Sequence, residues 1–502
     1  MSASREKNAR KDPVITKSTQ ELRNQQDAKN DRNFYIKCIV AVAALAIAFI
    51  LCFLYGNDNI RKNMTAVTVD GEKFSAAEVD FYYRSTVDTY SQYFSYLGVD
   101  PNKDLDSQKY DETQSWGDFL RDAAVNSLHQ TAAMYHTAVA DGYTLDEQSQ
   151  KELDDYSASI DTYCSENAMT RDQFLQTRFG DKMTNEIFMK HTEMMFVASA
   201  YMAEQKADTT YSEEELTSYY NEHKADIDRA DYEVLTINAD YSVIEGYDAE
   251  NPPEDGYTDA QTKEATEAAH EKALALQKRA EAGESLEALG KEIGDRYYSS
   301  KTNASFADYT MYAFNEWVFD DARTSGEIGL VEDTEKNTYY IVKMNQRYRP
   351  EYSTVNAGQI FFPAANSGLQ PGQEGYEEAL QLNLAKAQED AETALNKYRS
   401  GSKSFEEFAA EMGAQNSMMT QLTRGSGKVA PEVDLWLFND ARTVGDTDTI
   451  ATANGYALVS FEGTDVPAWQ VRCSEGLYNQ WAVDIYENAP LKTHTLGLKA
   501  VK

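Results

Sequence analysis

The chain has 502 residues, of which 42% are apolar, and a formal net charge of −36. This length predicts about three domains of roughly 150 residues each, and the apolar fraction is sufficient for packed cores, which excludes a chain disordered throughout. The charge is uneven: residues 1–37 hold nine Lys/Arg against five Asp/Glu, which leaves −40 for the rest. A surface that acidic argues against nucleic acid as a partner, because binding to nucleic acid depends largely on Lys/Arg that neutralise phosphates.

Residues 1–33 are polar, mixed in charge and without periodicity, so we expect a disordered tail there. Residues 38–55 then form a run of 18 residues without a charge, which reaches the lower length limit for a membrane-spanning helix. The basic flank before it predicts a single-pass membrane anchor over 34–56, with the tail in the cytoplasm and the later domains outside the cell. A cleaved signal peptide and a buried core helix are the alternatives, but the run is longer than the usual signal core of about 7–15 residues and no small-x-small site follows it.

Residues 64–230 are expected to form a helical module. At its start, residues 66–74 predict a hairpin with Asp70-Gly71 in the turn, and Ser75 with Glu78 has the pattern of a capping box. The helix that follows is expected to end at Gly98, and its apolar stripe consists of Val79, Tyr82, Tyr83, Val87, Tyr90, Phe94 and Leu97. Further helices are predicted over 116–142 and near 144–164, 170–178, 181–205 and 212–225, which indicates an all-α module with one long loop at 99–115.

A stretch of ten residues that begins at Trp317 returns 119 residues later at Trp436, with seven of the ten positions identical. The same offset relates further positions between Gly256 and Gly445. Two copies are too few for a solenoid, and a period of about 120 residues matches the size of an independent domain. The sequence therefore predicts two tandem copies of one small domain, over 231–350 and 351–464.

Both copies have the same order of predicted elements. In copy two a strand at 355–362 is followed by helices at 376–400, 404–413 and 432–441 and by strands at 447–452 and 456–461. In copy one the strand is at 232–238, the helices are near 258–282, 285–294 and 313–322, and the strands are at 327–331 and 338–344. This order fits a small α+β domain with a four-stranded antiparallel sheet. Residues 465–502 add one helical pattern that ends before Pro490, has no core of its own and must dock elsewhere.

Copy two carries Ser-Phe-Glu-Glu-Phe-Ala-Ala-Glu at 404–411, Val-x-x-Trp-x-Phe at 433–438 and Asn-Gly-Tyr at 454–456. With its element order, it resembles parvulin-type peptidyl-prolyl isomerase domains. Val-Thr-Val-Asp-Gly-Glu-Lys-Phe-Ser at 67–75, followed by a helical module, resembles the start of the extracytoplasmic foldases SurA and PrsA. The resemblance, which covers roughly 64–502, implies that 64–230 is a chaperone body for unfolded or nascent secreted polypeptides. It also implies that 465–502 packs back onto that body, and that the protein sits in the cell membrane of a bacterium of Gram-positive type.

The chain departs from the parvulin pattern at its two histidines. Active parvulins carry one His in the first strand and another in the last; here copy two has Gln359, followed by Ile360 and Phe361, and Ala457. Copy one has Tyr340 in its last strand and no His over 232–238. The aromatic residue of the family's pocket falls on Phe314 in copy one and on Val433 in copy two. The resemblance thus implies substrate-binding positions and no catalytic residue; these positions are Phe314, Tyr340, Gln359, Phe361, Val433 and Ala457.

Five tyrosines of the first helix can be assigned either to the core or to the surface. Tyr82, Tyr83 and Tyr90 lie on the apolar stripe and are assigned to the core. Tyr93 and Tyr96 lie off the stripe, and Tyr gives a large amphipathic contact at low entropy cost. We therefore take Tyr93 and Tyr96 as candidates for a groove that binds client polypeptides.

Rotation of an X–Pro bond crosses a barrier of about 18–20 kcal/mol and needs neither a nucleophile nor a metal. Losing the His pair therefore weakens the case for catalysis and does not end it. Three functions stay open: a membrane-anchored chaperone with degenerate parvulin-like domains, an active isomerase, and a non-catalytic scaffold for one fixed partner. The oligomeric state stays open too.

No metal and no cofactor are expected. The six His have no Cys or carboxylate spacing around them that completes a metal set, and we expect them at helix surfaces or edges. No P-loop, dinucleotide fingerprint or Gly-x-Ser-x-Gly occurs. Cys164 and Cys473 could form a disulfide if the last helix docks on the helical module, but two buried free thiols are the simpler expectation.

Overall fold

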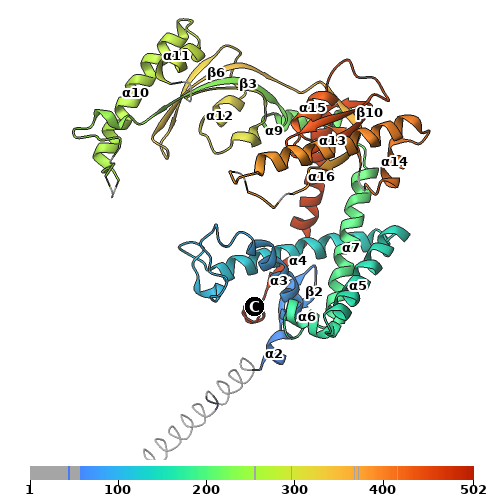
Figure 1. Ribbon diagram of the computed structural model, residues 1–502. Coiled ribbons are helices and arrows are strands. Elements are labelled where there is room, and N and C mark those ends of the chain that lie inside the picture. The colour runs from blue at the N-terminus through green and yellow to red at the C-terminus, as the bar shows by residue number, and fades with distance from the viewer. Residues whose placement is uncertain are drawn as a thin grey trace, which may run out of the picture. The chain divides into compact units, whose positions relative to one another are not determined.

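The structure, a computed structural model, describes residues 43, 45, 57–250, 252–253, 256–294, 297–366, 368–370, 372–414 and 417–502. The chain divides into two compact units, Met1–Thr209 with Trp481–Lys502 (unit 1) and Thr210–Gln480 (unit 2) (Figure 1). The predicted tail and nearly all of the predicted anchor over 34–56 lie outside the described residues. No helix within the described part of the chain is long and apolar enough to cross a membrane.

Unit 1 contains a small sheet. The predicted hairpin is confirmed as β1 (Thr65–Val69) and β2 (Glu72–Ser75), which pair antiparallel. Asp70 and Gly71 both have positive φ, 48° and 87°, as a tight two-residue hairpin turn requires. A third strand, β11 (Leu491–Thr493), pairs antiparallel with β1 and gives the order β11-β1-β2. Residues 64–230 are thus helical up to β3 apart from the predicted hairpin, whereas β11 was not predicted, because three exposed residues are too short a strand to leave a pattern in the sequence.

The helices of unit 1 begin at clear caps. Ser75 forms a capping box with Glu78 at α3 (Ala76–Ser91), as predicted, and Ser115 caps α4 (Trp116–Ala140) in the same way. The other helices are α2 (Asp58–Lys62), α5 (Glu147–Glu166), α6 (Arg171–Phe179) and α7 (Asn185–Asp208). Because α3 ends at Ser91 and turns follow, its apolar period does not continue to Leu97, which is 49% exposed. The loop at 99–115 contains one 3₁₀ turn, η1 (Leu105–Ser107).

The last part of the chain completes the packing of unit 1. Helix α16 (Ala468–Asn488) contributes its residues from Trp481 onward to this unit. Trp481, Ala482 and Ile485 lie in one apolar cluster with side chains of α4 and α7, among them Met134 and Val197. After β11 comes the short helix α17 (Thr495–Leu498), and residues 500 and 501 are buried in the main core of the unit. An amphipathic helix without a core of its own thus buries its apolar side here.

Unit 2 begins with α8 (Glu213–Glu222) and α9 (Lys224–Ile227), followed by two four-stranded antiparallel sheets. The first sheet has the order β4-β3-β6-β5, and its strands are β3 (Arg229–Asn238), β4 (Tyr298–Ala304), β5 (Ile328–Asp333) and β6 (Thr338–Tyr348). The second has the order β8-β7-β10-β9, with β7 (Ser353–Pro363), β8 (Met418–Leu422), β9 (Thr447–Thr452) and β10 (Gly455–Pro467). The two orders are equivalent, so the predicted four-stranded sheet is confirmed in both copies. Only β4 and β8 were not located in the sequence, because β4 is largely polar, β8 has only five residues, and both edge strands have few buried positions.

Helices cover both faces of each sheet. In copy one, α10 (Asp259–Glu281) and α11 (Leu286–Ile293) pack on one face, and α12 (Phe314–Phe319) packs on the other. In copy two, α13 (Tyr376–Ser400) and α14 (Phe405–Glu411) take the first face, and α15 (Pro431–Leu437) takes the second. Each copy therefore has two apolar cores separated by its sheet, as expected for an α+β domain.

The repeated ten-residue stretch explains why α12 and α15 are shorter than predicted. Asp320 Oδ1 accepts a hydrogen bond from the Ala322 amide at 2.9 Å, and the matching Asn439 Oδ1 accepts one from the Ala441 amide at 3.0 Å. These Asx turns offer the backbone an alternative to the helix and end it. In both copies an Arg of the stretch also lies over its Trp ring, at 5.2 Å for Arg323 and 4.2 Å in copy two. The sequence repeat is thus a repeat of local structure.

Candidate functional site

The predicted positions of copy two lie on one face of its sheet. Phe361 of β7 lies directly opposite Ala457 of β10, and Gln359 lies opposite Val459. Residues directly opposite in antiparallel strands share a face, as do residues two apart in one strand. Val433 of α15 belongs to the same buried cluster as Ala457. The fold therefore brings all four predicted residues of copy two to the face that α15 covers.

Gln359 has an unsatisfied polar atom on this face. Gln359 is half-buried, and its side-chain oxygen is buried without a hydrogen-bond partner. Ala457 is 1% exposed and presents only a methyl group, whereas the ring of Phe361 is 43% exposed. An unpaired buried acceptor costs about 1–3 kcal/mol. An N–H donor from a bound polypeptide would therefore be favoured beside Gln359, next to an accessible aromatic ring.

Copy one fills the equivalent positions with large apolar groups. The register of β3 and β6 places Tyr340 opposite Thr236 and Val234 opposite Val342, so Tyr340 takes the place of Ala457 and Val234 that of Gln359. Phe314 and Tyr340 are 6% and 3% exposed, and their ring centroids lie 5.0 Å apart at 74°. Edge-to-face packing of this kind stabilises a core. The predicted site of copy one is thus a packed aromatic cluster.

The aromatic cluster of copy one is neutral at physiological pH. Burial, together with the negative charge of Asp333, raises the pKa of Tyr340 to about 12. Asp333 itself accepts hydrogen bonds from the backbone amide and the ammonium group of Lys336, at 3.0 and 3.2 Å. Tyr232 is fully buried, its hydroxyl has no hydrogen-bond partner, and burial raises its pKa as well. Neither phenol is placed as a general acid or base.

The two unit 1 candidates, Tyr93 and Tyr96, lie in the turns after α3 and are 52% and 88% exposed. Phe94 between them is buried in the main core of the unit. Tyr110 in the following loop is 42% exposed and stacks on Phe119 of α4, with centroids 4.2 Å apart at 10°. This end of unit 1 therefore presents aromatic rings to solvent while a neighbouring ring anchors the turn.

A cavity of about 370 Å³ lies in unit 1 where the β1–β2 turn, α4 and the end of α16 meet. Its lining residues are Asp70, Ala133, His136, Thr137, Ala140, Trp481, Asp484, Ile485, Asn488 and Ala489. The lining is mixed, with carboxylates and an imidazole beside small aliphatic groups and an indole. Sequence analysis did not find this site, because its three segments come together only in the fold.

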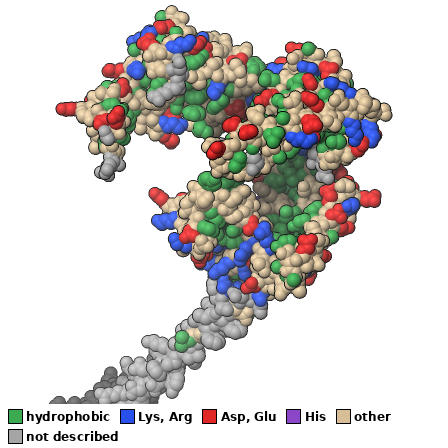
Figure 2. Space-filling model, viewed as in Figure 1, with side chains coloured by type: hydrophobic (Ala, Val, Ile, Leu, Met, Phe, Trp, Pro, Cys, Tyr) green, Lys and Arg blue, Asp and Glu red, His purple; other side chains and the backbone are tan. Residues whose placement is uncertain are grey.

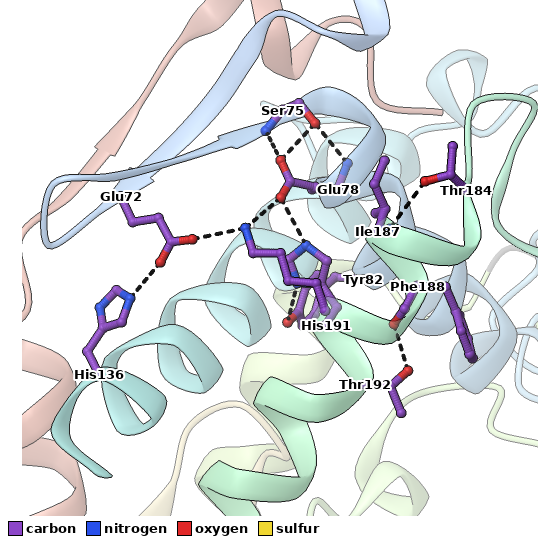
Figure 3. Close-up of polar contacts among 11 residues, drawn as sticks. Glu72, Ser75, Glu78, Tyr82, His136, Thr184, Ile187, Phe188, His191 and Thr192 are labelled. Atoms are coloured by element: carbon purple, nitrogen blue, oxygen red, sulfur yellow. Dashed lines mark hydrogen bonds and ion pairs between the residues drawn. The ribbon is translucent and has the colours of Figure 1, made fainter. Parts of the chain in front are cut away.

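A chain of ion pairs leads from this cavity into the core of unit 1 (Figure 3). His136 Nε2 lies 2.7 Å from Glu72 Oε2, and Lys190 Nζ lies 2.9 Å from a carboxylate oxygen of both Glu72 and Glu78. Glu78 Oε1 also lies 3.4 Å from Nε2 of His191, which is fully buried. The expectation that the histidines lie at helix surfaces or edges was wrong for His191, because α7 has packed neighbours on the side where this ring points.

The network fixes the charge of Glu78. Burial alone would raise the pKa of Glu78, but the nearby His191 ring and the hydrogen bonds from Lys190 and the Ser75 amide lower it to about 2. For Glu72, burial likewise acts against Lys190 and His136, and the pKa ends below its usual value. The sequence marked Glu78 only as a helix cap; its partners on α7 carry no local signal.

The remaining chemistry of the described residues is limited. They include no group of three or more His, Cys, Asp or Glu that could hold a metal ion. Cys164 and Cys473 are both buried free thiols. Burial raises the pKa of Cys473 to about 11, so this thiol is protonated at neutral pH. Figure 2 shows Asp and Glu side chains spread over the visible surface of both units, in line with the net charge.

Comparison with known proteins found a family match for the N-terminal part of the chain. Residues 25–201 match the model of a family described as the SurA-like N-terminal domain. The resemblance of this part of the chain to SurA-like foldases is thereby confirmed. A search of curated proteins found no match.

Three solved structures are similar at low identity. One is from the pair PEB4 and Cj1289, SurA-like chaperones of Campylobacter jejuni, at 11% identity over 67% of this chain and 96% of that chain, with a TM-score of 0.14. The foldase PrsA of Lactococcus lactis matches at 12% identity over 71% and 94%, with a TM-score of 0.16. The foldase PrsA of Streptococcus pneumoniae matches at 15% over 62% and 99%, with a TM-score of 0.18. With TM-scores this low, no conclusion about this chain rests on them.

Proposed function

We propose that this protein is a membrane-anchored extracytoplasmic chaperone that binds unfolded or nascent secreted polypeptides, with two parvulin-like domains that lack the family's histidine pair. The observation that carries the proposal is the match of residues 25–201 to the SurA-like N-terminal domain. The two tandem α+β domains support the assignment of two parvulin-like domains, since their sheets have equivalent strand orders. The acidic surface keeps such a protein soluble and apart from other anionic chains.

Client binding by unit 1 needs sheltered apolar surface of a few hundred Å². Two places in unit 1 present apolar side chains from which a client-binding surface could be built. Tyr93, Tyr96 and Tyr110 are exposed at one end of the unit, and the 370 Å³ cavity has Trp481 and Ile485 in its lining. Both places suit a holdase that binds apolar segments without sequence specificity.

Weak or absent isomerase activity follows from the sheet faces beside α12 and α15. Copy one has two buried aromatic rings, Phe314 and Tyr340, where the family's binding pocket would be. Copy two has Ala457, which donates and accepts no side-chain hydrogen bond, in place of the last-strand histidine. A second candidate function, a slow isomerase, has one observation in its favour: Gln359 of copy two keeps an unpaired acceptor beside the accessible ring of Phe361.

The test follows cis-to-trans relaxation of a proline peptide with and without the full chain, beside an aggregation assay on an unfolded client. We expect aggregation to be slowed at equimolar protein and relaxation to be little changed. Strong acceleration that Gln359→Leu abolishes would instead establish the isomerase in copy two, and the matched variant Tyr340→Phe in copy one should change nothing. No effect on aggregation would contradict the chaperone proposal and leave the scaffold for one fixed partner.

The anchor is a separate part of the proposal, supported by the charge-free run at 38–55 and its basic flank. Protease added to intact cells should remove the later domains and leave a membrane fragment that contains residues 1–55. A released mature protein that begins after Tyr55 would show that the run is a cleaved signal. Both outcomes are distinguished by mass measurement of the fragments.

A further inference from the structure

Two arginines of unit 2, Arg229, which is buried, and Arg472, which is half-buried, each have a buried Nε without a hydrogen-bond partner. Arg229, the first residue of β3, is 5% exposed, and its Nε is buried without a hydrogen-bond partner. Arg472, in the second turn of α16, also has a buried Nε without a partner. Among the described residues, neither guanidinium group forms an ion pair or a side-chain hydrogen bond with the protein. A charge without a partner on the buried Arg229 is destabilising, so this arrangement requires an explanation.

The fold brings the two arginines to one place, the start of the linker between the tandem domains. Arg229 pairs with Tyr348 in the β3–β6 ladder. Four residues further on, Tyr352 O accepts a hydrogen bond from the Ala468 amide at 2.9 Å, which seats the first turn of α16 on the linker. Arg472 follows one turn later on the same side of that helix. The positive charge of Arg472 acts on Arg229 in the same sense as burial, and both lower the Arg229 pKa.

The nearby carboxylates already have other partners. Asp228 lies 2.8 Å from Arg347, and Glu351 lies 2.6 Å from Arg349. Asp308, whose negative charge also reaches Arg229, is exposed and accepts a hydrogen bond from the Ser305 amide at 2.8 Å. None of them forms an ion pair with Arg229.

More positive charge surrounds the pair. The guanidinium group of Arg424 lies 5.1 Å from the ring of Tyr352, and that of Arg349 lies 4.2 Å from the ring of Trp469. In a chain of net charge −36, four arginines thus lie around this junction, and one of them, Arg349, is paired with Glu351. Such a junction attracts an anion that the rest of the surface repels.

We propose that Arg229 and Arg472 form a binding site for a small oxyanion of the phosphate or sulfate class, which ties the start of β3 to the start of α16. Guanidinium groups present N–H donors in a planar fork that matches oxyanions bidentately. Two such forks, one from a strand and one from a helix, meet a tetrahedral anion from two directions, whereas a carboxylate offers only two oxygens. The inference stands independently of the chaperone function.

The test is hydrogen exchange on the full chain in nanodiscs, with phosphate titrated against chloride at constant ionic strength. Exchange at the start of β3 and of α16 should slow in a saturable way, about tenfold when free phosphate is ten times its Kd. Sulfate should act as phosphate does, and acetate should act weakly. A phosphorylated peptide in place of free phosphate tests whether a larger molecule can carry the anion; we expect it to act weakly, because Arg229 is buried.

Two variants and a control decide the outcome. Arg229→Met should lose the saturable response, and without phosphate it should be as stable as the unchanged protein or more so, because it removes an unpaired buried charge. Arg229→Lys keeps the charge without the fork and should bind phosphate at least tenfold more weakly. Arg279→Met, at an exposed arginine already paired with Glu284 and Glu292, should respond as the unchanged protein does. An equal response in Arg229→Met, or its strong destabilisation without phosphate, would overturn the proposal.

Discussion

The ion-pair network of unit 1 makes a strong prediction for Glu78→Gln. The Glu78 side chain is 13% exposed and accepts hydrogen bonds from the Ser75 amide at 2.7 Å and from Lys190 at 2.9 Å. Gln has nearly the same shape and can still accept one of these bonds. The substitution therefore removes the negative charge and leaves the packing in place. His191, which is fully buried, loses its charged neighbour.

The expected loss of stability follows from the pKa of Glu78. A fall from 4.5 to about 2, at about 1.4 kcal/mol per pH unit, corresponds to about 3.5 kcal/mol at pH 7. Because the pKa is lower in the folded state, this stability is present above pH 4.5 and is lost as the pH falls toward 2. Lys190 is 40% exposed and keeps Glu72 as a partner, so we expect Glu78→Gln to cost about 2–3 kcal/mol at pH 7.

The assay is hydrogen exchange of α3 and α7 in the full chain, measured from pH 7 to pH 4, because the two units need not unfold together. Opening free energies of the two helices should fall together in Glu78→Gln, and the difference from the unchanged protein should shrink as the pH falls below 4.5. Glu287→Gln, which breaks an exposed pair with Lys291, serves as control and should change neither helix. A loss below about 0.5 kcal/mol, or a loss that does not depend on pH, would refute the reasoning.

Three further substitutions test other parts of the structure. Phe314→Ala should destabilise copy one by about 3–5 kcal/mol, since it empties a buried aromatic position, and faster exchange in β3 and β6 with copy two unchanged would show it. Gly358→Ala should cost about 1–3 kcal/mol, because a Cβ there would lie 2.2 Å from the ring of Phe405; normal stability by urea unfolding would contradict this. Burial raises the pKa of Asp80 to about 6 in spite of its ion pair with Lys62, so the charged carboxylate lowers the stability of unit 1 above that pH. Asp80→Asn should therefore stabilise unit 1 at pH 8 by about 2 kcal/mol. If the variant is also more stable at pH 4, the charge of Asp80 is not the reason.

Local structure could be predicted from the sequence because its signals act between residues within one or two turns. The hairpin turn at Asp70-Gly71, the capping box of Ser75 and Glu78, helix α13 over 376–400 and strand β9 over 447–452 all have the predicted places. The repeat of domains was visible as well, since each copy encodes the same Asx turn and the same Trp–Arg contact. The assignment of Tyr93, Tyr96, Gln359 and the other site residues to client binding stays a prediction.

The tertiary structure decided what depends on partners far apart in the chain. Strand β11 exists because β1, more than 400 residues earlier, offers it an edge. Glu78 meets Lys190 across 112 residues, and Arg229 of β3 comes near Arg472 of α16 only because the linker that follows Tyr348 is hydrogen-bonded to the first turn of α16. The sequence does not show whether a charged side chain contacts water, an oppositely charged side chain or a bound ion. Its surroundings set its energy, and only the fold brings those surroundings together.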